Sequence, residues 1–184
     1  MKKLLFTAIA ALVFSAGVSA QKYFTKDGTV HFFSSTKVEN IEATNNKATC
    51  VLDAATGDIQ WSVLIKGFTF EKALMEEHFN ENYMESTTYP KSEFKGKVEN
   101  ISTVNFKKDG TYKVKVSGDL TLHGVTKKIT TDGNIIVAGG KITSDSKFFI
   151  NPNDYKINIP AAVKEKISEN IEITVNATLA ELKK

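Results

Sequence analysis

The sequence predicts an all-β protein, an antiparallel barrel or sandwich that a single helix interrupts. Three observations predict it: apolar and polar residues alternate along many short segments, turns that contain glycine separate these segments, and only residues 71–85 have helical periodicity. Eight or more strands in a 184-residue chain, joined mostly by short turns, are typical of both architectures. The pattern alone leaves both of them open.

The clearest element is a hairpin over residues 113–131. Its returning strand is favoured by Val125, Ile129 and several threonines, because β-branched side chains suit strands. Gly124 provides the backbone freedom of the turn, and Gly118 predicts a bulge or a sharp bend within the first strand. That first strand alternates between polar side chains and an apolar set of Val114, Val116, Leu120 and Leu122.

The same alternation predicts strands before and after this hairpin. The apolar pattern changes phase at Gly67, between Ile65 and Phe68, and a bulge is the simplest explanation. A turn is expected at residues 108–110. The remaining expected strands span residues 29–34, 47–52, 58–66, 134–137, 142–150 and 171–179, with Phe94, Val98, Val104 and Phe106 in strands between the helix and the hairpin.

Residues 71–85 are predicted to form one amphipathic helix that ends before Pro90, since proline disfavours a helical residue in front of it. This helix is the only expected element able to cover the mouth of a barrel. It is therefore a candidate lid, and a plug that simply closes the core is the alternative. One side of the helix carries Leu74, Met75, His78, Phe79, Asn82 and Tyr83.

The first 20 residues predict a secretory signal peptide. Two lysines precede an apolar run that extends to Val18, and small residues up to Ala20 form a cleavage site. Cleavage after Ala20 leaves residues 21–184, a length that fits one domain, and no later stretch approaches the roughly 18 apolar residues of a membrane-spanning helix. No cysteine directly follows the cleavage site to carry a lipid anchor. The sequence therefore predicts a protein that is released into the periplasm or secreted.

Charge and cysteine content argue against several functions. The formal net charge is +3, and without the leader's Lys2 and Lys3 it is +1, so binding to nucleic acid is not expected. All 24 basic residues are lysine, so the bidentate clamps that arginine forms on phosphates are absent. Cys50 is the only cysteine, which excludes an internal disulfide and predicts a small buried apolar side chain.

No motif predicts catalysis, a cofactor or a metal site. His31, His78 and His123 do not occur at a spacing that would place two ligands on one face of a strand or helix. The chain contains no nucleophile elbow, HExxH motif, P-loop or Rossmann glycine pattern. The sequence therefore predicts a protein that is not an enzyme, and a hydrolase or metal protein built on two converging histidines is a less favoured alternative.

Three segments, in matching order, resemble the YceI-like family, bacterial envelope proteins that hold polyisoprenoid or other long-chain lipids inside an antiparallel β-barrel. The first runs from His78-Phe79-Asn80 through the Tyr89-Pro90 turn to Phe94, the second is the hairpin at 118–129, and the third spans 148–155. The resemblance covers nearly the whole mature chain. It implies a lipocalin-like barrel of about eight strands with one short helix.

The resemblance further implies that the protein binds a long-chain isoprenoid or acyl lipid in the barrel interior, without catalysis. Family members often carry arginine in the late loop, where this chain has Asn151 and Asn153, and this weakens the case for a pyrophosphate headgroup. An integral outer-membrane barrel is an alternative, and the helix and the lysines on nearly every strand argue against it. A homodimer is left open. The residues predicted to line the interior are Phe32, Trp61, Val63, Phe68, Phe70, Leu74, Phe79, Phe94, Phe106, Leu122 and Phe148.

Overall fold

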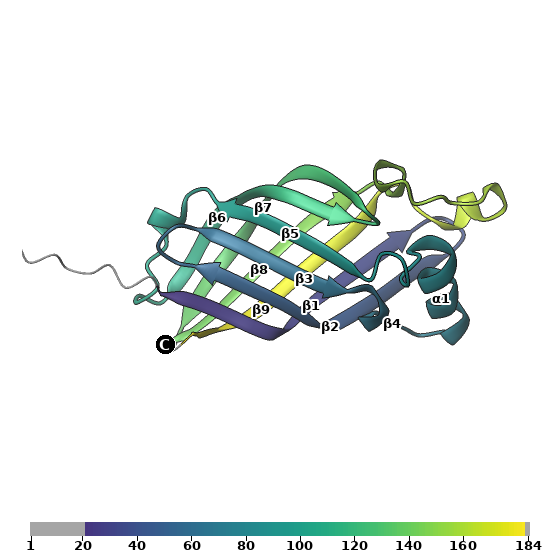
Figure 1. Cartoon of the computed structure of the whole chain (residues 1–184). Helices are drawn as coiled ribbons and strands as arrows, with labels where there is room; N and C mark the ends of the chain where they lie inside the picture. Colours follow the sequence, from purple (N-terminus) through teal and green to yellow (C-terminus); the bar gives the residue numbers. More distant parts are fainter. Residues whose placement is uncertain (1–20, 183–184) are drawn as a thin grey trace, which may run out of the picture.

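Nine strands and one short α-helix make up the computed structural model, which describes residues 21–182 (Figure 1). The predicted signal peptide lies outside the described residues. Within them, no helix is long and apolar enough to cross a bilayer. The elements are β1 (Lys22–Ser35), β2 (Asn40–Asp53), β3 (Asp58–Leu64), β4 (Thr69–Phe70), α1 (Ala73–His78), β5 (Lys91–Val98), β6 (Gly110–Leu122), β7 (Val125–Ala138), β8 (Lys141–Ile150) and β9 (Ile171–Glu181).

Eight of the strands form a closed antiparallel barrel. Neighbouring strands follow the order β1, β2, β3, β5, β6, β7, β8 and β9, and β9 pairs with β1 to complete the ring. The two-residue strand β4 pairs with β2 beyond the end of β3. The predicted barrel of about eight strands with one short helix is therefore confirmed, and the sandwich alternative is wrong.

The hairpin between β6 and β7 has the predicted alternation and turn. Its turn residues, His123 and Gly124, have φ angles of 49° and 72°, and Leu122 pairs directly with Val125. Positive φ at both central residues is the geometry of a type I′ turn, which matches the twist of the flanking strands. The apolar set Val114, Val116, Leu120 and Leu122 is buried, as predicted.

Of the bulge or sharp bend predicted at Gly118, the bulge is absent, because β6 pairs with β5 and β7 without a shift in register there. Gly118 instead lies opposite Gly96, and a Cβ on Gly118 would lie 2.4 Å from the Cα of Gly96. The ring of Phe94 covers both glycines, since its Cζ would be 2.5 Å and 2.8 Å from their added Cβ atoms. The two glycines therefore make room for an aromatic ring inside the barrel.

The bulge predicted at Gly67 is also replaced by another structure, a 3-10 turn over Ile65–Gly67. The side-chain amide of Asn45 donates a hydrogen bond of 2.8 Å to the carbonyl of Leu64 at this point. Asn45 is fully buried, and a Cβ on Gly67 would lie 2.6 Å from its amide nitrogen. The turn therefore wraps around a buried asparagine, which a hydrophobic pattern does not reveal.

The helix is shorter than predicted. α1 is followed by a π-helical turn over Phe79–Tyr83, so the helical segment spans residues 73–83. The side-chain amide of Asn80 donates to the carbonyl of Glu76 at 2.9 Å, and Glu85 has a left-handed φ of 42°. These features end the helix before residue 85, and Figure 1 shows it across one end of the barrel.

Residues 151–170, here called the strap, join β8 to β9 without forming a strand. They contain 3-10 turns at Pro152–Tyr155 and Ala161–Lys166. The backbone amide of Ser168 donates to Ser34 Oγ at 2.9 Å, and Lys127 Nζ lies 2.8 Å from Asp154 Oδ1. The strap therefore runs along the same end of the barrel as α1 and is tied to the wall at both of its ends.

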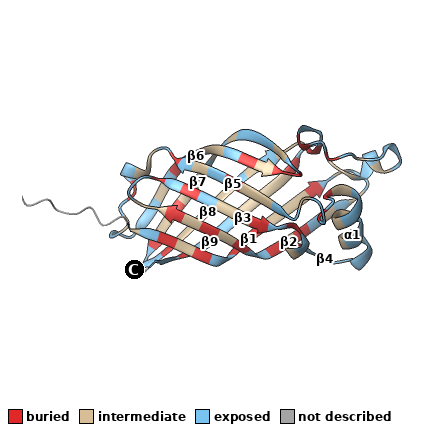
Figure 2. Cartoon of the chain, viewed as in Figure 1, coloured by how far each residue is buried: buried red, intermediate tan, exposed pale blue. Residues whose placement is uncertain are grey.

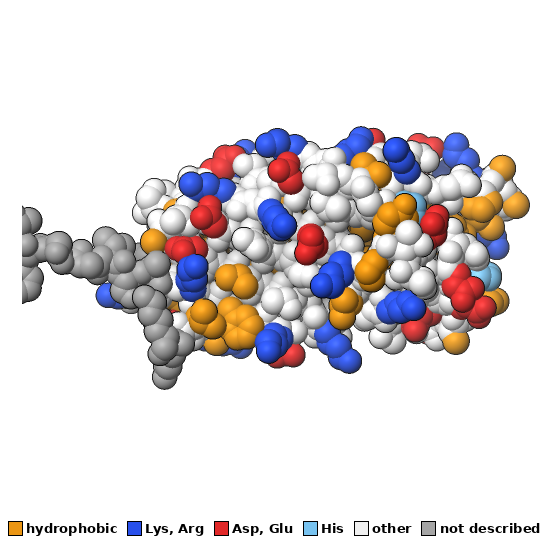
Figure 3. All heavy atoms as spheres, in the orientation of Figure 1, with side chains coloured by type: hydrophobic (Ala, Val, Ile, Leu, Met, Phe, Trp, Pro, Cys, Tyr) orange, Lys and Arg blue, Asp and Glu red, His pale blue; other side chains and the backbone are white. Residues whose placement is uncertain are grey.

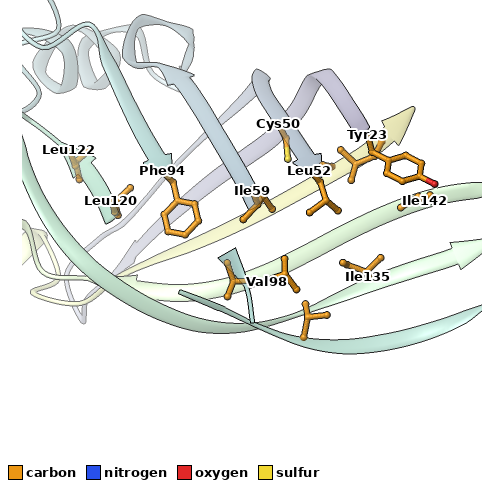
Figure 4. Close-up of a cluster of buried hydrophobic side chains, with 14 of the residues drawn as sticks. Tyr23, Cys50, Leu52, Ile59, Phe94, Val98, Leu120, Leu122, Ile135 and Ile142 are labelled. Atoms are coloured by element: carbon orange, nitrogen blue, oxygen red, sulfur yellow. The ribbon is translucent and has the colours of Figure 1, made fainter. Parts of the chain in front are cut away.

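The two ends of the barrel differ in how their interiors are filled. At the closed end, which contains the chain termini of the described part, Tyr23 stacks on Phe106 with ring centroids 5.2 Å apart. Val137, Ile142 and Leu179 are all at most 4% exposed there. Figure 2 shows buried positions alternating with exposed ones along the strands, and Figure 4 shows the buried side chains pointing into one interior. The open end carries α1, the β1–β2 turn and the strap.

Candidate functional site

The barrel encloses a cavity of about 540 Å³. This volume lies within the range of about 300–1,000 Å³ that is typical of ligand pockets. Every one of the eight barrel strands contributes residues to the wall, and α1 and the strap add residues at the open end. The lining is mainly aliphatic and aromatic, so the cavity suits an apolar ligand.

Opposite walls of the cavity carry side chains of different size. Trp61 on β3 and Phe94 on β5 are neighbours across the strand pair and belong to an aromatic wall. In a ring of eight strands, β8 lies opposite β3, and its inward positions there are Ser144 and Ser146. The short side chains on β8 leave the space that the rings opposite them do not fill.

The backbone pairing between β8 and β7 ends partway along the cavity wall. The last paired residues are Gly133 and Ser146, although β7 continues towards the open end and β8 continues to Ile150. Beyond this point, side-chain hydroxyls replace the ladder: Thr131 Oγ1 lies 3.0 Å from Ser146 Oγ, which donates to the carbonyl of Asp132 at 2.8 Å. Pro152, Ile157 and Ile159 of the strap complete the cavity lining near this gap.

An aromatic cluster holds the helical segment against the barrel. The ring of Phe79 lies 5.4 Å from Phe32, 5.6 Å from Phe68 and 5.0 Å from Phe70, measured between centroids. Phe32 itself packs on Phe68 at 5.7 Å and on Phe70 at 5.6 Å. Such pairs add to the stabilisation that comes from burial alone. The ring of Phe79 therefore holds the predicted lid against the barrel, in addition to the backbone that connects the two.

Charged residues occur where the cavity reaches the surface. Lys72 directly precedes α1 and His78 is its last residue, and Glu39 and Lys166 come from the β1–β2 turn and the strap. Lys166 Nζ lies 3.9 Å from Glu39 Oε2, a contact that links the turn to the strap across the opening. A ligand that fills the apolar interior would meet polar groups at this opening and at a few polar side chains of the wall, such as Ser92, Asn134 and Ser146.

Ten of the eleven residues predicted to line the interior lie on the cavity wall, and their contact with a lipid stays a prediction. Phe106 is the exception. It lies in the loop after the 3-10 turn at Ile101–Thr103 rather than in a strand, and it stacks on Tyr23 outside the cavity. The residues on the wall are Phe32, Trp61, Val63, Phe68, Phe70, Leu74, Phe79, Phe94, Leu122 and Phe148.

Sequence reasoning missed the small-residue wall and the strap. Selecting large apolar side chains excluded Ser144 and Ser146, although they have the same parity as Ile142 and Phe148 on β8 and lie on the same face. The strap residues Ile157 and Ile167 also line the cavity. Strand parity would have found the serines, whereas the strap has no regular period from which to predict its inward positions.

The three histidines occupy separate elements. His31 on β1 lies 3.0 Å from Glu42 through Nε2, and His78 is at the opening. His123 is buried at the hairpin turn, with Nδ1 3.2 Å from the carbonyl of Tyr155 and Nε2 3.5 Å from Glu85 Oε1. Over residues 21–182, no group of three or more histidine, cysteine or acidic side chains is arranged to hold a metal ion.

Cys50 lies on the inner face of β2 and is fully buried, as the sequence predicted. Burial raises the pKa of its thiol to about 12. Because the thiolate is the nucleophilic form, the side chain is chemically quiet at neutral pH. Cys50 is therefore part of the packed interior.

A model of the YceI-like domain matches residues 15–179. The chain belongs to the YceI-like family. The segments that carried the resemblance in the sequence fall at α1 and β5, at the β6–β7 hairpin, and at the junction of β8 with the strap.

Several solved structures share this YceI-like fold at low sequence identity. A polyisoprenoid binding domain from Saccharophagus degradans has a TM-score of 0.75 and 16% identity, covering 89% of this chain and 99% of its own. Burkholderia cenocepacia BcnA has a TM-score of 0.67 and 17% identity, covering 83% and 96%. The YCEI protein of Campylobacter jejuni has a TM-score of 0.53 and 19% identity over both whole chains. No curated protein matches the sequence.

Proposed function

We propose that this protein is an exported, non-enzymatic binding protein that holds a polyisoprenoid or another long-chain amphiphilic lipid inside its barrel. The observation that carries the proposal is the apolar cavity of about 540 Å³, closed at one end and open beside α1 at the other. The name of the Saccharophagus degradans relative, a polyisoprenoid binding domain, supports the same class of ligand. The tail would occupy the interior, and the headgroup would lie at the opening.

Burial of the tail supplies the affinity in this proposal. Each CH₂ removed from water contributes about 0.8 kcal/mol, so a tail of about ten carbons contributes roughly 8 kcal/mol before the cost of association. Lys72 and Lys166 can contact a polar headgroup at the opening, but neither offers the bidentate geometry of arginine. The proposal therefore expects selectivity for tail length and shape over a particular charged headgroup.

The outer wall of the barrel favours a binding protein over an integral membrane barrel. Lys115 lies 3.9 Å from Asp132, and Lys128 lies 3.9 Å from Asp119, and all four of these side chains are exposed on neighbouring strands. Charges on a lipid-facing wall are destabilising in membrane barrels. An outer wall of this kind fits an aqueous surrounding.

Native mass spectrometry of protein purified without detergent from its own host tests ligand binding. We expect an added mass that lipid extraction releases as a long-chain amphiphile. Ser144→Phe, which fills the cavity from its inner wall, should remove the added mass, whereas Thr143→Phe on the outer face of the same strand should retain it. A wild-type protein that is repeatedly free of amphiphile would overturn the proposal.

Export has a separate test, because it depends on residues 1–20. N-terminal sequencing of the protein from fractionated cells should find a chain that begins at Gln21 in the periplasmic or secreted fraction. An intact Met1 on protein confined to the cytoplasm would contradict export and would leave the lipid-binding proposal in place.

A further inference from the structure

Exposed large hydrophobic side chains gather at one end of the barrel. Among residues 21–182, five such side chains are at least half exposed, and four of them lie towards the open end: Val38 at 58%, Leu64 at 51%, Leu74 at 61% and Phe149 at 60%. The fifth, Leu182 at 50%, lies at the closed end. Figure 3 shows hydrophobic side chains at the surface around the end that carries α1, and a further group near the opposite end.

One of these exposed side chains also belongs to the cavity wall. Leu74 is 61% exposed and also belongs to the cavity wall, so one side chain faces both water and the interior. Val38 directly precedes Glu39, and Leu64 directly precedes Ile65, and both of these following residues line the cavity. Leu74 therefore joins the exposed apolar surface of the open end to the cavity, while Val38 and Leu64 are next in sequence to residues of its wall.

Unpaired lysines accompany the exposed apolar residues. Lys37, Lys66 and Lys72 lie within two positions of Val38, Leu64 and Leu74, and each lysine is exposed. None of the three has an acidic partner within 4 Å in the part of the chain that the structure describes. An apolar side chain beside a free lysine suits the boundary between acyl chains and phosphates in a bilayer.

We propose that the open end docks on a phospholipid bilayer, with Val38 and Leu64 entering the interface, and that the amphiphile passes directly between the bilayer and the cavity. This inference rests on the proposed function. A long apolar tail is strongly disfavoured in water, so a path that keeps it covered lowers the barrier to loading. α1 also carries Glu76 and Glu77, so apolar insertion contributes more to docking than net charge does.

Transfer of a pyrene-labelled fatty acid from vesicles of phosphatidylcholine and phosphatidylglycerol tests the inference. The double variant Val38→Asp/Leu64→Asp changes two exposed residues outside the cavity wall, and Leu182→Asp is the matched control at the other end. We expect the wild-type transfer rate to rise with vesicle concentration and to fall roughly tenfold or more in the double variant, because two apolar anchors are lost. Leu182→Asp should transfer at the wild-type rate.

A second measurement separates docking from binding. Equilibrium binding of the same probe, delivered from ethanol without vesicles, should be unchanged in both variants. If the double variant transfers as fast as the wild type, or the Leu182→Asp control slows equally, the docking inference is overturned while binding stands. If the wild type does not bind the probe even from ethanol, the proposed function fails.

Discussion

The closed end and the open end of the barrel are made by the same strands, yet their interiors are packed differently. At the closed end, Tyr23 stacks on Phe106 and buried aliphatic side chains pack in the interior. At the open end, rings gather under the helical segment and on one wall, and serines face them from β8. One barrel therefore carries a packed core at the closed end and an apolar cavity that reaches the surface at the open end, and substitutions at the two ends should affect different properties.

The largest expected effect is at the closed end. Leu179→Ala should lower the free energy of unfolding by about 2–5 kcal/mol, because Leu179 is 4% exposed and its removal leaves a cavity among packed neighbours. Leu74→Ala is the matched change at the open end, and since Leu74 is 61% exposed it should change stability by less than about 0.5 kcal/mol. Urea denaturation measures both. Equal losses of unfolding free energy in the two variants would contradict the difference between the two ends.

A smaller and local effect is expected for Phe79. Phe79→Ala removes three aromatic contacts, so it should cost roughly 1–3 kcal/mol, mostly in the attachment of the helical segment. Hydrogen exchange should accelerate in α1 and remain slow in β6. Phe149→Ala, which removes an exposed ring, is the control and should leave both elements unchanged. Uniform acceleration over the whole barrel would show that the helix is not a separate unit.

Because of Cys50, the free energy of unfolding should fall as the pH rises above about 9. Burial raises the pKa of the thiol from 9.0 to about 12, so the unfolded chain loses this proton first as the pH rises. The stabilisation that comes from burying the neutral thiol is therefore fully present below pH 9. It is lost towards pH 12, and the free energy of unfolding falls by about 1.4 kcal/mol per pH unit in this range. Denaturation between pH 8 and about 10 should show this decline, and Cys50→Ala should flatten it. An identical slope in both proteins would contradict a buried neutral thiol.

The smallest effect is expected where the strap meets the wall. Lys127 and Asp154 are about half exposed, so solvent screens their contact of 2.8 Å. Asp154→Asn should lower stability by only about 0.2–1 kcal/mol, and high salt should erase the difference. A loss comparable to that of Leu179→Ala would mean that the strap belongs to the packed core.

The sequence predicted most of the fold because strand alternation directly reports burial on one face. The buried set in β6 and the turn at Gly124 followed from period and turn chemistry, and the ring of about eight strands followed from the resemblance. Bulges were predicted incorrectly at two glycines. Gly118 and Gly67 interrupt the apolar pattern because they pack closely against Phe94 and Asn45. Those contacts join residues far apart in the chain, and no local pattern records them.

The candidate site was predicted only in part. Choosing large apolar residues found the aromatic wall, because exposing such side chains to water is unfavourable and they therefore point into the barrel. The same choice included Phe106, whose loop position turns it to the closed end, and omitted Ser144 and Ser146. A cavity exists where side chains are small, so a search for bulk finds the wall and overlooks the space.

Trp61 offers the most direct test of the central claim that the cavity holds a long-chain amphiphile. It is the only tryptophan in the chain and lies on the cavity wall, so a brominated fatty acid bound in the cavity should quench its fluorescence. We expect saturable quenching with one ligand per protein in the wild type and in Thr143→Phe, and none in Ser144→Phe. Quenching that does not saturate, or that is equal in Ser144→Phe, would contradict the claim.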